Sequence, residues 1–372
     1  MASASDSAWM ARALRLAREG LYTSDPNPRV GCVVVRDDAV VGEAFHARAG
    51  EGHAEVRALE RAGDAARGAC IYVTLEPCCH HGRTPPCTEA LIEAGVARVV
   101  YALRDPNPRV GGAGARRLSE AGIAVERLDS AGPEARALNI GFVKRMATGR
   151  PWIRVKLAMS LDGRTALASG ESRWITGEAA RTDVHRWRAR ASCILTGRGT
   201  VAADDPSLTV RLPPAEMPEP PRTPWIAIAD SGLATAPGSR LFDLHERVVL
   251  FTLDATAGDT AALAGRGAEI VALPGDAHGI DPGSLFAELG RREVNEVHVE
   301  AGPTLCGRLL ETGYIDELIV YMAPQVLGDG ARGLFSMAPL ASMAERTRLH
   351  MREVRHVGAD LRIQALPLID RE

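Results

Sequence analysis

The first 147 residues alternate between short apolar runs and stretches with helical spacing of apolar positions. Apolar runs at 30–36 and 40–45 are separated by the polar turn "RDDA", which predicts a pair of strands joined tightly. Strand and helix patterns then follow one another up to residue 146, as is typical of an α/β sandwich with helices on both faces of a sheet. Further strands are expected at 70–75, 97–103 and 124–128, and helices at 9–19, 53–61, 88–94, 113–121 and 133–146.

A second α/β unit is expected after the segment "ATGRP" at 147–151, which separates a first domain, 1–147, from a second, 148–372. The proline-rich stretch 211–224, "RLPPAEMPEPPRTP", is expected to be an exposed loop, because strand patterns continue after it. The patterns predict strands at 152–159, 192–196, 225–229, 247–251, 269–272, 296–300 and 317–321, helices at 176–189 and from 304, and a closing hairpin around "HVGAD".

Composition fits a globular protein: of 372 residues, 46% are apolar and 24% charged, and the net charge is −3. This weakly acidic balance gives no support for nucleic-acid binding, and no apolar run is long enough to span a membrane. The N-terminus lacks the apolar core of a secretory signal, so we expect a cytoplasmic protein. Three of the seven cysteines lie within ten positions, which indicates thiol or metal chemistry rather than a disulfide framework.

The stretch 74–87, "TLEPCCHHGRTPPC", is crowded with side chains that could bind a metal. Upstream of it, His53 and Glu55 form an H-x-E at the start of a predicted helix. An H-x-E followed later by Pro-Cys is typical of zinc deaminases, in which His and two Cys bind zinc while the Glu carries protons. Zinc lowers the pKa of bound water toward neutrality, which makes a nucleophile available at working pH. The candidate ligands in the stretch are Cys78, Cys79, His80, His81 and Cys87.

We expect His53, Cys78 and Cys87 to bind zinc, with water in the fourth position. Cys87 follows Cys78 by nine positions instead of the usual three, so residues 79–86 are interpreted as an inserted loop. Cys87 then opens a helix, whose positive end favours a thiolate. Cys79 should point elsewhere because adjacent side chains diverge, and the two loop histidines could line the substrate pocket. The alternative is a structural zinc site or free cysteines in a loop.

Two glycine-containing stretches follow strand patterns in the second half: "CILTGRGTVAADDP" and "VHVEAGPTLCGRLL". Backbone amides at such a helix start suit a phosphate, although each stretch alone is more often an ordinary turn. No G-x-G-x-x-G follows a strand, so an ordinary dinucleotide-binding fold is not indicated. Arg188 and Arg211 could clamp a phosphate bidentately. The repeated "DPNPRVG", at 25–31 and 105–111, represents either two ordinary turns or two loops of one pocket.

Taken in order, "PNPRVGCVVV", "HARAGEGHAEVRAL", "TLEPCCHHGRTPPC", "KLAMSLDGRTA", "SGESRWIT", "ADDPSLTVR" and "VEAGPTL" closely resemble the bifunctional deaminase/reductase family of riboflavin biosynthesis. The resemblance covers nearly the whole chain. It implies a cytidine-deaminase-like three-layer sandwich followed by a dihydrofolate-reductase-like domain. The first domain would deaminate 2,5-diamino-6-(5-phosphoribosylamino)pyrimidin-4-one with Zn²⁺. The second would reduce the ribosyl group to ribityl with NADPH, giving 5-amino-6-(5-phosphoribitylamino)uracil.

Site residues carry over by resemblance onto matching positions of this chain. The family's zinc ligands match His53, Cys78 and Cys87, and its proton shuttle matches Glu55. Asn27 and His46 match pocket positions beside the zinc. Cys79 stands where the family often has Ser, which leaves a spare thiol near the metal. The matched reductase substrate contacts are Lys156, Ser172, Arg188, Leu208, Arg211 and Glu300. The matched NADPH contacts are Ala158, Trp174, Thr200, Asp204, Ser231, Gly302, Pro303, Thr304 and Leu305.

The implied partners are small phosphorylated pyrimidines, with no nucleic acid and no membrane. The sequence does not give the oligomeric state, and a homo-oligomer is the expectation. One alternative is a nucleoside or tRNA adenosine deaminase with an accessory domain. The acidic balance disfavours that alternative, and it leaves the second half unexplained. Another is a non-catalytic binding protein with structural zinc, in which Glu55 would have no use.

Overall fold

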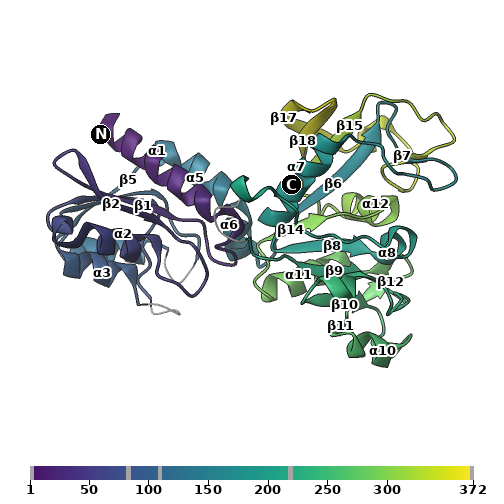
Figure 1. Cartoon of the computed structure of the whole chain (residues 1–372), viewed down its shortest axis with the longest axis horizontal. Helices are drawn as coiled ribbons and strands as arrows, with labels where there is room; N and C mark the ends of the chain where they lie inside the picture. The colour runs from purple at the N-terminus through teal and green to yellow at the C-terminus, as the bar shows by residue number, and fades with distance from the viewer. Residues whose placement is uncertain (1–3, 81–84, 108–110, 217–220, 369–372) are drawn as a thin grey trace. The chain divides into compact units, whose positions relative to one another are not determined.

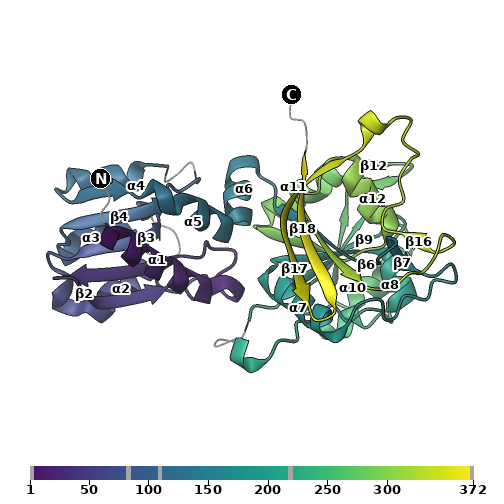
Figure 2. The ribbon, with the colours of Figure 1, turned by 90° about the horizontal axis from the view of Figure 1, so that it is seen from above.

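The computed structural model describes residues 4–80, 85–107, 111–216 and 221–368 (Figures 1 and 2). The chain divides into two compact units. Unit 1 contains Met1–Gly149 with Glu219–Arg222, and unit 2 contains Arg150–Pro218 with Thr223–Glu372. Among the described residues, no helix is long and apolar enough to cross a membrane.

Unit 1 is built on a five-stranded sheet in the order β2-β1-β3-β4-β5. β1 runs antiparallel to β2 and to β3, whereas β3, β4 and β5 are parallel. The β1–β2 turn uses Asp37 and Asp38 at positive φ, as tight hairpins require. The strands are β1 (Gly31–Arg36), β2 (Ala39–Phe45), β3 (Cys70–Leu75), β4 (Arg98–Leu103) and β5 (Ala124–Arg127).

Helices cover both faces of this sheet, with α1 and α5 on one side and α2 and α3 on the other (Figure 1). The apolar side chains of β1, β3 and β4 fill the core between these layers. The expected three-layer α/β arrangement of the first half is therefore correct. The helices are α1 (Ala4–Glu19), α2 (Ala54–Ala62), α3 (Cys87–Ala94), α4 (Ala113–Glu120), α5 (Gly132–Leu138) and α6 (Ile140–Thr148), with 3-10 turns at Gly20–Tyr22, Gly63–Ala66 and Asp129–Ala131.

The single helix predicted for 133–146 is wrong, because Asn139 divides it into α5 and α6. The amide of Asn139 is buried and holds the backbone of Arg29 at two points. Its Oδ1 accepts from Arg29 N at 2.7 Å, and its Nδ2 donates to Arg29 O at 3.0 Å. Asn139 itself leaves the helical conformation, with φ −110° and ψ 25°. A contact across 110 positions of sequence thus overrides the local helical pattern.

Unit 2 contains a nine-stranded sheet in the order β11-β10-β9-β8-β14-β6-β15-β18-β17. The strands from β11 to β15 are parallel to their neighbours, and the C-terminal hairpin β17–β18 joins antiparallel. The strands of this sheet are β6 (Trp152–Ser160), β8 (Cys193–Gly197), β9 (Trp225–Ala229), β10 (Val248–Thr252), β11 (Ala268–Ala272), β14 (Glu296–Val299), β15 (Glu317–Ala323), β17 (Arg348–Val357) and β18 (Asp360–Leu368). Two small antiparallel pairs lie outside it: β7 (Arg164–Ala166) pairs with β16 (Arg332–Gly333), and β12 (Gly275–Asp276) pairs with β13 (Gly279–Ile280).

The two faces of this sheet differ in character. Ile153, Val155 and Leu157 of β6 point to an apolar core shared with α11 and α12. The opposite face carries the charged or polar residues Arg154 and Lys156 of β6 and Glu296 and His298 of β14. Arg154 stacks over Trp187 of α7 on this face. The helices are α7 (Glu178–Arg190), α8 (Arg198–Asp204), α9 (Leu241–Leu244), α10 (Thr260–Gly265), α11 (Pro282–Arg291) and α12 (Pro303–Glu311), with 3-10 turns at Pro214–Glu216 and Met343–Glu345.

The helices α8 to α11 were not predicted from the sequence, although two of them carry clear start signals. Asp281 caps α11 by accepting from Ser284 N at 2.7 Å, and Pro282 occupies the first turn. Asp259 caps α10, because its side chain accepts from Ala262 N at 3.0 Å. Both helices are short, so apolar periodicity alone gives a weak signal there.

Candidate active sites

The predicted metal ligands converge in unit 1. His53 is the N-cap residue of α2, Cys78 follows β3, and Cys87 opens α3. Their ligand atoms all lie within 4.8 Å of one another. His53 Nδ1 is 3.2 Å from Cys87 Sγ and 3.6 Å from Cys78 Sγ. One imidazole nitrogen and two sulfurs form the donor set that Zn²⁺ takes when one tetrahedral position stays open, so the residues present fit zinc.

Electrostatics favour a thiolate in this cluster. A hydrogen bond from Cys87 lowers the pKa of Cys78 to about 4, against the opposing effect of burial. The same hydrogen bond raises the pKa of Cys87. One thiolate is thus favoured in the pair even before a metal binds, and zinc takes both sulfurs as thiolates.

Glu55 lies in the first turn of α2, two residues after His53, and its side chain is buried. Burial raises the pKa of Glu55, while the charge of His53 acts in the opposite direction. A carboxyl group with a raised pKa can both accept and release a proton near neutral pH.

Asn27 and His46 meet beside the metal ligands. Asn27 Nδ2 is 3.0 Å from His46 Nε2, and the ring of His46 stands edge-on to that of His53 at 5.2 Å. Burial lowers the pKa of His46 to about 4, so the ring is neutral. Since His46 Nδ1 lies 3.3 Å from Gly52 O, we assign the proton to Nδ1 and the acceptor role to Nε2.

Glu76 is a site residue that sequence reasoning missed. It is buried directly before Pro77-Cys78, and its carboxylate accepts from three backbone amides: Asp105 N at 3.3 Å, Gly112 N at 3.0 Å and Ala115 N at 3.2 Å. These contacts fasten the β4–α4 connection to the metal-ligand segment. That connection carries the second "DPNPRVG", of which residues 108–110 lie outside the described residues, as does His81.

The predicted reductase residues gather where the parallel strands of unit 2 end. Val299 of β14 pairs with Val155 of β6 and with Leu195 of β8, so Lys156 and Glu300 are the next residues in neighbouring strands. Ligands bind at the carboxyl ends of parallel strands in open α/β sheets. The strand register, rather than any local motif, therefore brings Lys156 and Glu300 together.

Arg188 of α7 completes this cluster by pairing with Glu300. Its Nε and Nη2 donate to the two carboxylate oxygens at 2.5 and 2.9 Å, and its Nη1 donates to Thr209 O at 3.0 Å. A phosphate clamp by Arg188 would therefore require breaking an existing pair. Burial lowers the pKa of Lys156, although Glu300 acts against that shift. Among the described residues, no hydrogen bond to the Lys156 ammonium occurs.

Arg211 reaches the same cluster through His185, which sequence reasoning missed. Arg211 Nε is 3.4 Å from His185 Nε2, and His185 Nδ1 is 3.0 Å from Thr209 O. Burial lowers the pKa of His185 to about 4, so a neutral ring joins the two. Leu208, one residue before Thr209, is buried with a positive φ of 47°. A lone histidine within a polar helix gives no sequence signal for this role.

The predicted cofactor residues lie at two neighbouring strand ends and in one loop. Gly302 N donates to Thr200 Oγ1 at 3.1 Å, which joins the start of α8 to the start of α12, where Pro303, Thr304 and Leu305 stand. A Cβ atom at Gly199 would meet nothing within 4 Å, so the backbone there is open to a ligand. This open backbone at the start of α8, joined to the start of α12, could accommodate a phosphate of NADPH.

Trp174 is 70% exposed, so it is not a core residue. Arg181 stacks over its ring at 4.7 Å, and the neighbouring Arg173 donates to Asp204 O at 2.8 Å. Ala158 lies on β6, two residues after Lys156, and Ser231 follows β9. Within the described parts of the chain, the side chains of Ser172 and Ser231 make no hydrogen bond to the other predicted residues.

Comparison with known proteins also finds two regions in the chain. Residues 3–103 match the cytidine and deoxycytidylate deaminase zinc-binding region, and residues 151–363 match the RibD C-terminal domain. The expected fold class, a cytidine-deaminase-like unit followed by a dihydrofolate-reductase-like unit, is thereby confirmed.

Full-length relatives match both units at once. The riboflavin biosynthesis protein RibD of Escherichia coli K12 is 48% identical over 365 residues, covering 96% of this chain and 98% of the relative. The solved structure of Acinetobacter baumannii RibD, form 2, superposes with a TM-score of 0.90 at 42% identity, covering 98% of this chain and 99% of that one. A diaminohydroxyphosphoribosylaminopyrimidine deaminase/5-amino-6-(5-phosphoribosylamino)uracil reductase from Thermotoga maritima superposes with a TM-score of 0.85 at 33% identity, with the same coverage. The chain belongs to the RibD family of riboflavin biosynthesis proteins.

Proposed function

We propose that the chain is a bifunctional enzyme of riboflavin biosynthesis. Residues 1–147 form a zinc-dependent deaminase domain, which converts 2,5-diamino-6-(5-phosphoribosylamino)pyrimidin-4-one to the corresponding uracil and releases ammonia. Residues 148–372 form an NADPH-dependent reductase domain, which converts the ribosyl side chain to ribityl. The observation that carries the proposal is the presence, in one chain, of the His53–Cys78–Cys87 group with Glu55 and of the Lys156–Glu300–Arg188 cluster.

In the deaminase domain, zinc held by the one imidazole and two sulfurs would supply an activated water as nucleophile. Glu55 takes a proton from the attacking water and passes it to the ring nitrogen. It then takes the remaining hydroxyl proton, as the carbonyl forms, and gives it to the leaving amine. Its raised pKa suits both directions of transfer. Neutral His46, with its Nδ1 proton committed to Gly52 O, holds the Asn27 amide in one orientation toward the substrate.

In the reductase domain, NADPH would supply a hydride to the first carbon of the opened ribosyl chain. The start of α12 and Thr200 hold the cofactor, while Trp174 lines its pocket. Lys156 donates a hydrogen bond to the pyrimidine, and Arg211 binds the phosphorylated side chain. Glu300 keeps Arg188 in place and offsets the cost of burying the Lys156 ammonium.

The two activities give separate signals in one assay. Ammonia release should require zinc and not NADPH. Loss of the NADPH absorbance should require both the pyrimidine and completed deamination. Oxidation of NADPH at the same rate without the pyrimidine, or an absence of ammonia from the zinc-loaded protein, would contradict the assignment.

A homo-oligomer is proposed as well. The outer strand β17 exposes Met351 (56%) and Val354 (54%) at the edge of the sheet, where unpaired backbone groups also lie. An apolar edge strand is a typical surface for pairing with a second chain. Light scattering after gel filtration measures the mass directly, and a monomer at micromolar concentration would contradict this proposal. The seven cysteines, all within the described residues, form no disulfide, which supports a cytoplasmic location.

A further inference from the structure

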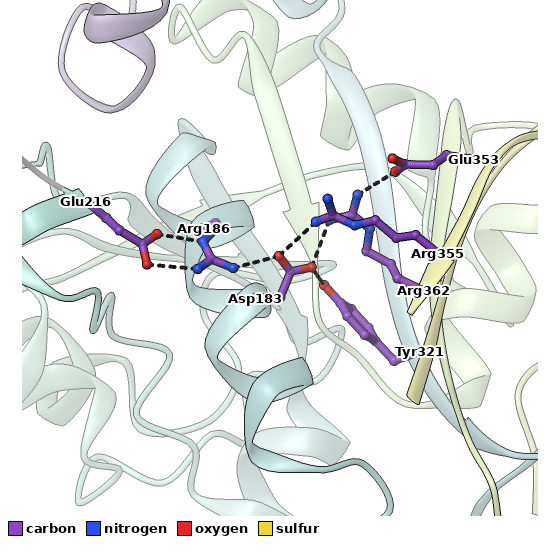
Figure 3. Close-up of polar contacts among 7 residues, drawn as sticks. All are labelled: Asp183, Arg186, Glu216, Tyr321, Glu353, Arg355 and Arg362. Atoms are coloured by element: carbon purple, nitrogen blue, oxygen red, sulfur yellow. Dashed lines mark hydrogen bonds and ion pairs between the residues drawn. The ribbon is translucent and has the colours of Figure 1, made fainter. Parts of the chain in front are cut away.

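The helix α7 is fastened to the C-terminal hairpin through one buried carboxylate. Figure 3 shows Asp183 at the centre of a set of donors from α7, β15, β17 and β18. Its Oδ2 accepts from Tyr321 at 2.7 Å and from Arg362 at 2.9 Å, and its Oδ1 accepts from Arg186 at 3.0 Å and from Arg355 at 3.5 Å. Since α7 also carries His185 and Arg188, these contacts fix the helix that faces the reductase cluster.

Arg186 extends this set of contacts to the proline-rich loop. Its Nε and Nη2 donate to the two carboxylate oxygens of Glu216 at 2.6 and 2.8 Å, while its Nη1 donates to Asp183 (Figure 3). A fork that holds a carboxylate at two points fixes orientation as well as distance. The far end of the segment 207–216 is thereby attached to α7.

The near end of the same segment has its own attachments. His245 Nε2 lies 2.7 Å from Ser207 O, and both Arg188 and His185 contact Thr209 O. Between these points, Leu208 is held at a φ of 47°, a conformation that a leucine adopts only when its surroundings impose it. The segment that presents Leu208 and Arg211 is therefore held at both ends. Only the far-end pair, Arg186 with Glu216, lies outside the predicted substrate contacts.

We propose that Arg186 and Glu216, anchored by Asp183, are positioning residues for the pyrimidine substrate of the reductase, because they hold the segment 207–216 against α7. This inference rests on the proposed reductase function, in which Leu208 and Arg211 contact that substrate. The pair determines how well the segment is ordered before binding. Weakening it adds an ordering cost to substrate binding and leaves the hydride step unchanged.

The test is Glu216→Gln, which keeps the shape of the side chain and removes its charge, together with Arg186→Lys, which keeps the charge and removes the fork. In steady-state assays of the full chain, each variant should raise the KM for the deaminated pyrimidine about three- to fivefold, the range expected for a partly exposed pair. The kcat, the KM for NADPH and the deaminase rate should stay at parent values, because Glu216 and Arg186 touch none of the groups involved.

Arg292 provides a matched control within the same unit. Its Nη1 and Nη2 hold Glu269 at 2.7 and 2.6 Å, and its Nε contacts the nearly buried Glu288, which reproduces the arrangement of Arg186 far from the site residues. Glu269→Gln should lower the thermal midpoint about as much as Glu216→Gln while leaving the pyrimidine KM unchanged. An unchanged KM in Glu216→Gln, or an equal rise in both variants, overturns the inference. If the parent protein reduces no pyrimidine at all, it is the proposed function that fails.

Discussion

Arg188 and Glu300 form a two-point ion pair between α7 and the end of β14, with N–O distances of 2.5 and 2.9 Å. Both side chains are only 12% exposed. Burial alone would raise the pKa of Glu300. The charge and hydrogen bonds of Arg188, together with His298 and the charge of Lys156, outweigh burial and lower the pKa well below its ordinary value. The ionised form of Glu300 is thus favoured, and Lys156 lies next to a negative charge.

Glu300→Gln should abolish reduction and leave deamination at the parent rate. The variant leaves the Arg188 guanidinium buried without its countercharge, which typically costs about 3–5 kcal/mol. Urea unfolding and separate assays of the two activities measure both effects. A double variant, Arg188→Met with Glu300→Met, should be more stable than Glu300→Gln and still inactive as a reductase. A single variant as stable as the parent would show that the pair is not buried in solution.

Glu55→Gln should lower the deamination rate by about a hundredfold or more, the usual share of a proton-transferring side chain. Zinc content, measured by elemental analysis, should stay near one per chain, since Glu55 is not among the three converging ligands. Reduction of deaminated substrate should not change. Glu51→Gln serves as the control, because Glu51 lies on the same segment but is exposed and pairs only loosely with Arg57 at 3.7 Å. Loss of zinc from Glu55→Gln would assign this residue a structural role.

The zinc content of single variants should distinguish the roles of Cys78, Cys79 and Cys87. Cys78→Ala and Cys87→Ala should each lose zinc, whereas Cys79→Ala should retain it, because the converging group contains the first two and not the third. Each protein is purified without chelator and its zinc is determined against protein concentration. An empty site in Cys79→Ala alone would replace Cys78 by Cys79 in the ligand set.

The zinc site could be predicted because its information is local. His53 and Glu55 are two positions apart at a helix start. Cys78 lies just after β3, and Cys87 begins α3. Adjacent elements of an α/β unit pack together, so short motifs at their ends meet in space. The same reasoning located most strands, since each is a continuous apolar run.

The polar face of the reductase sheet could not be predicted in this way. Asp183 meets Tyr321 and Arg362 across 138 and 179 positions, and nothing in the local sequence of α7 distinguishes it from a solvated helical aspartate. Asn139 broke a predicted helix for the same reason, since its partner lies 110 positions away. Side chains whose partners come from distant strands are found only once the strand order is known.

Acid should destabilise unit 2 through His185. Its pKa is lowered from 6.5 to about 4 by burial and by the nearby charge of Arg188. Above pH 6.5 the ring is neutral in both folded and unfolded chains. As the pH falls from 6.5 toward 4, His185 binds a proton in the unfolded chain but not in the folded chain. The free energy of unfolding therefore decreases in that window. After solvent screening, the loss should be about 1–2 kcal/mol.

His185→Gln removes one of the buried histidines of unit 2 whose pKa is lowered. It should reduce the pH dependence of the free energy of unfolding between 6.5 and 4, while His245 and His298 keep their share. Urea titrations at several pH values, followed by the fluorescence of the unit 2 tryptophans, give the slope for parent and variant. His350→Gln, at an exposed position on β17, should keep the parent slope. Equal slopes in the parent and His185→Gln would show that the ring titrates normally in the folded protein.

The order of the two reactions should depend on Lys156. Its side chain leaves β6 on the polar face, opposite Val155 and Leu157, and its ammonium makes no hydrogen bond to the described residues. An ammonium has three donors and no acceptor, so it can donate to the carbonyl of the deaminated pyrimidine but not pair with the amine of the undeaminated one.

Leaving such groups unpaired typically costs about 1–3 kcal/mol, or roughly ten- to a hundredfold in kcat/KM. Lys156→Met keeps the length of the side chain and removes its donors. The reductase kcat/KM for the two pyrimidines should therefore fall mainly for the deaminated compound, so that their ratio approaches one. Because Met also removes a buried charge next to Glu300, Lys156→Arg is measured beside it and should retain part of the discrimination. If Lys156→Met leaves the ratio at its parent value, another group distinguishes oxo from amino, and the ammonium serves only to balance the charge of Glu300.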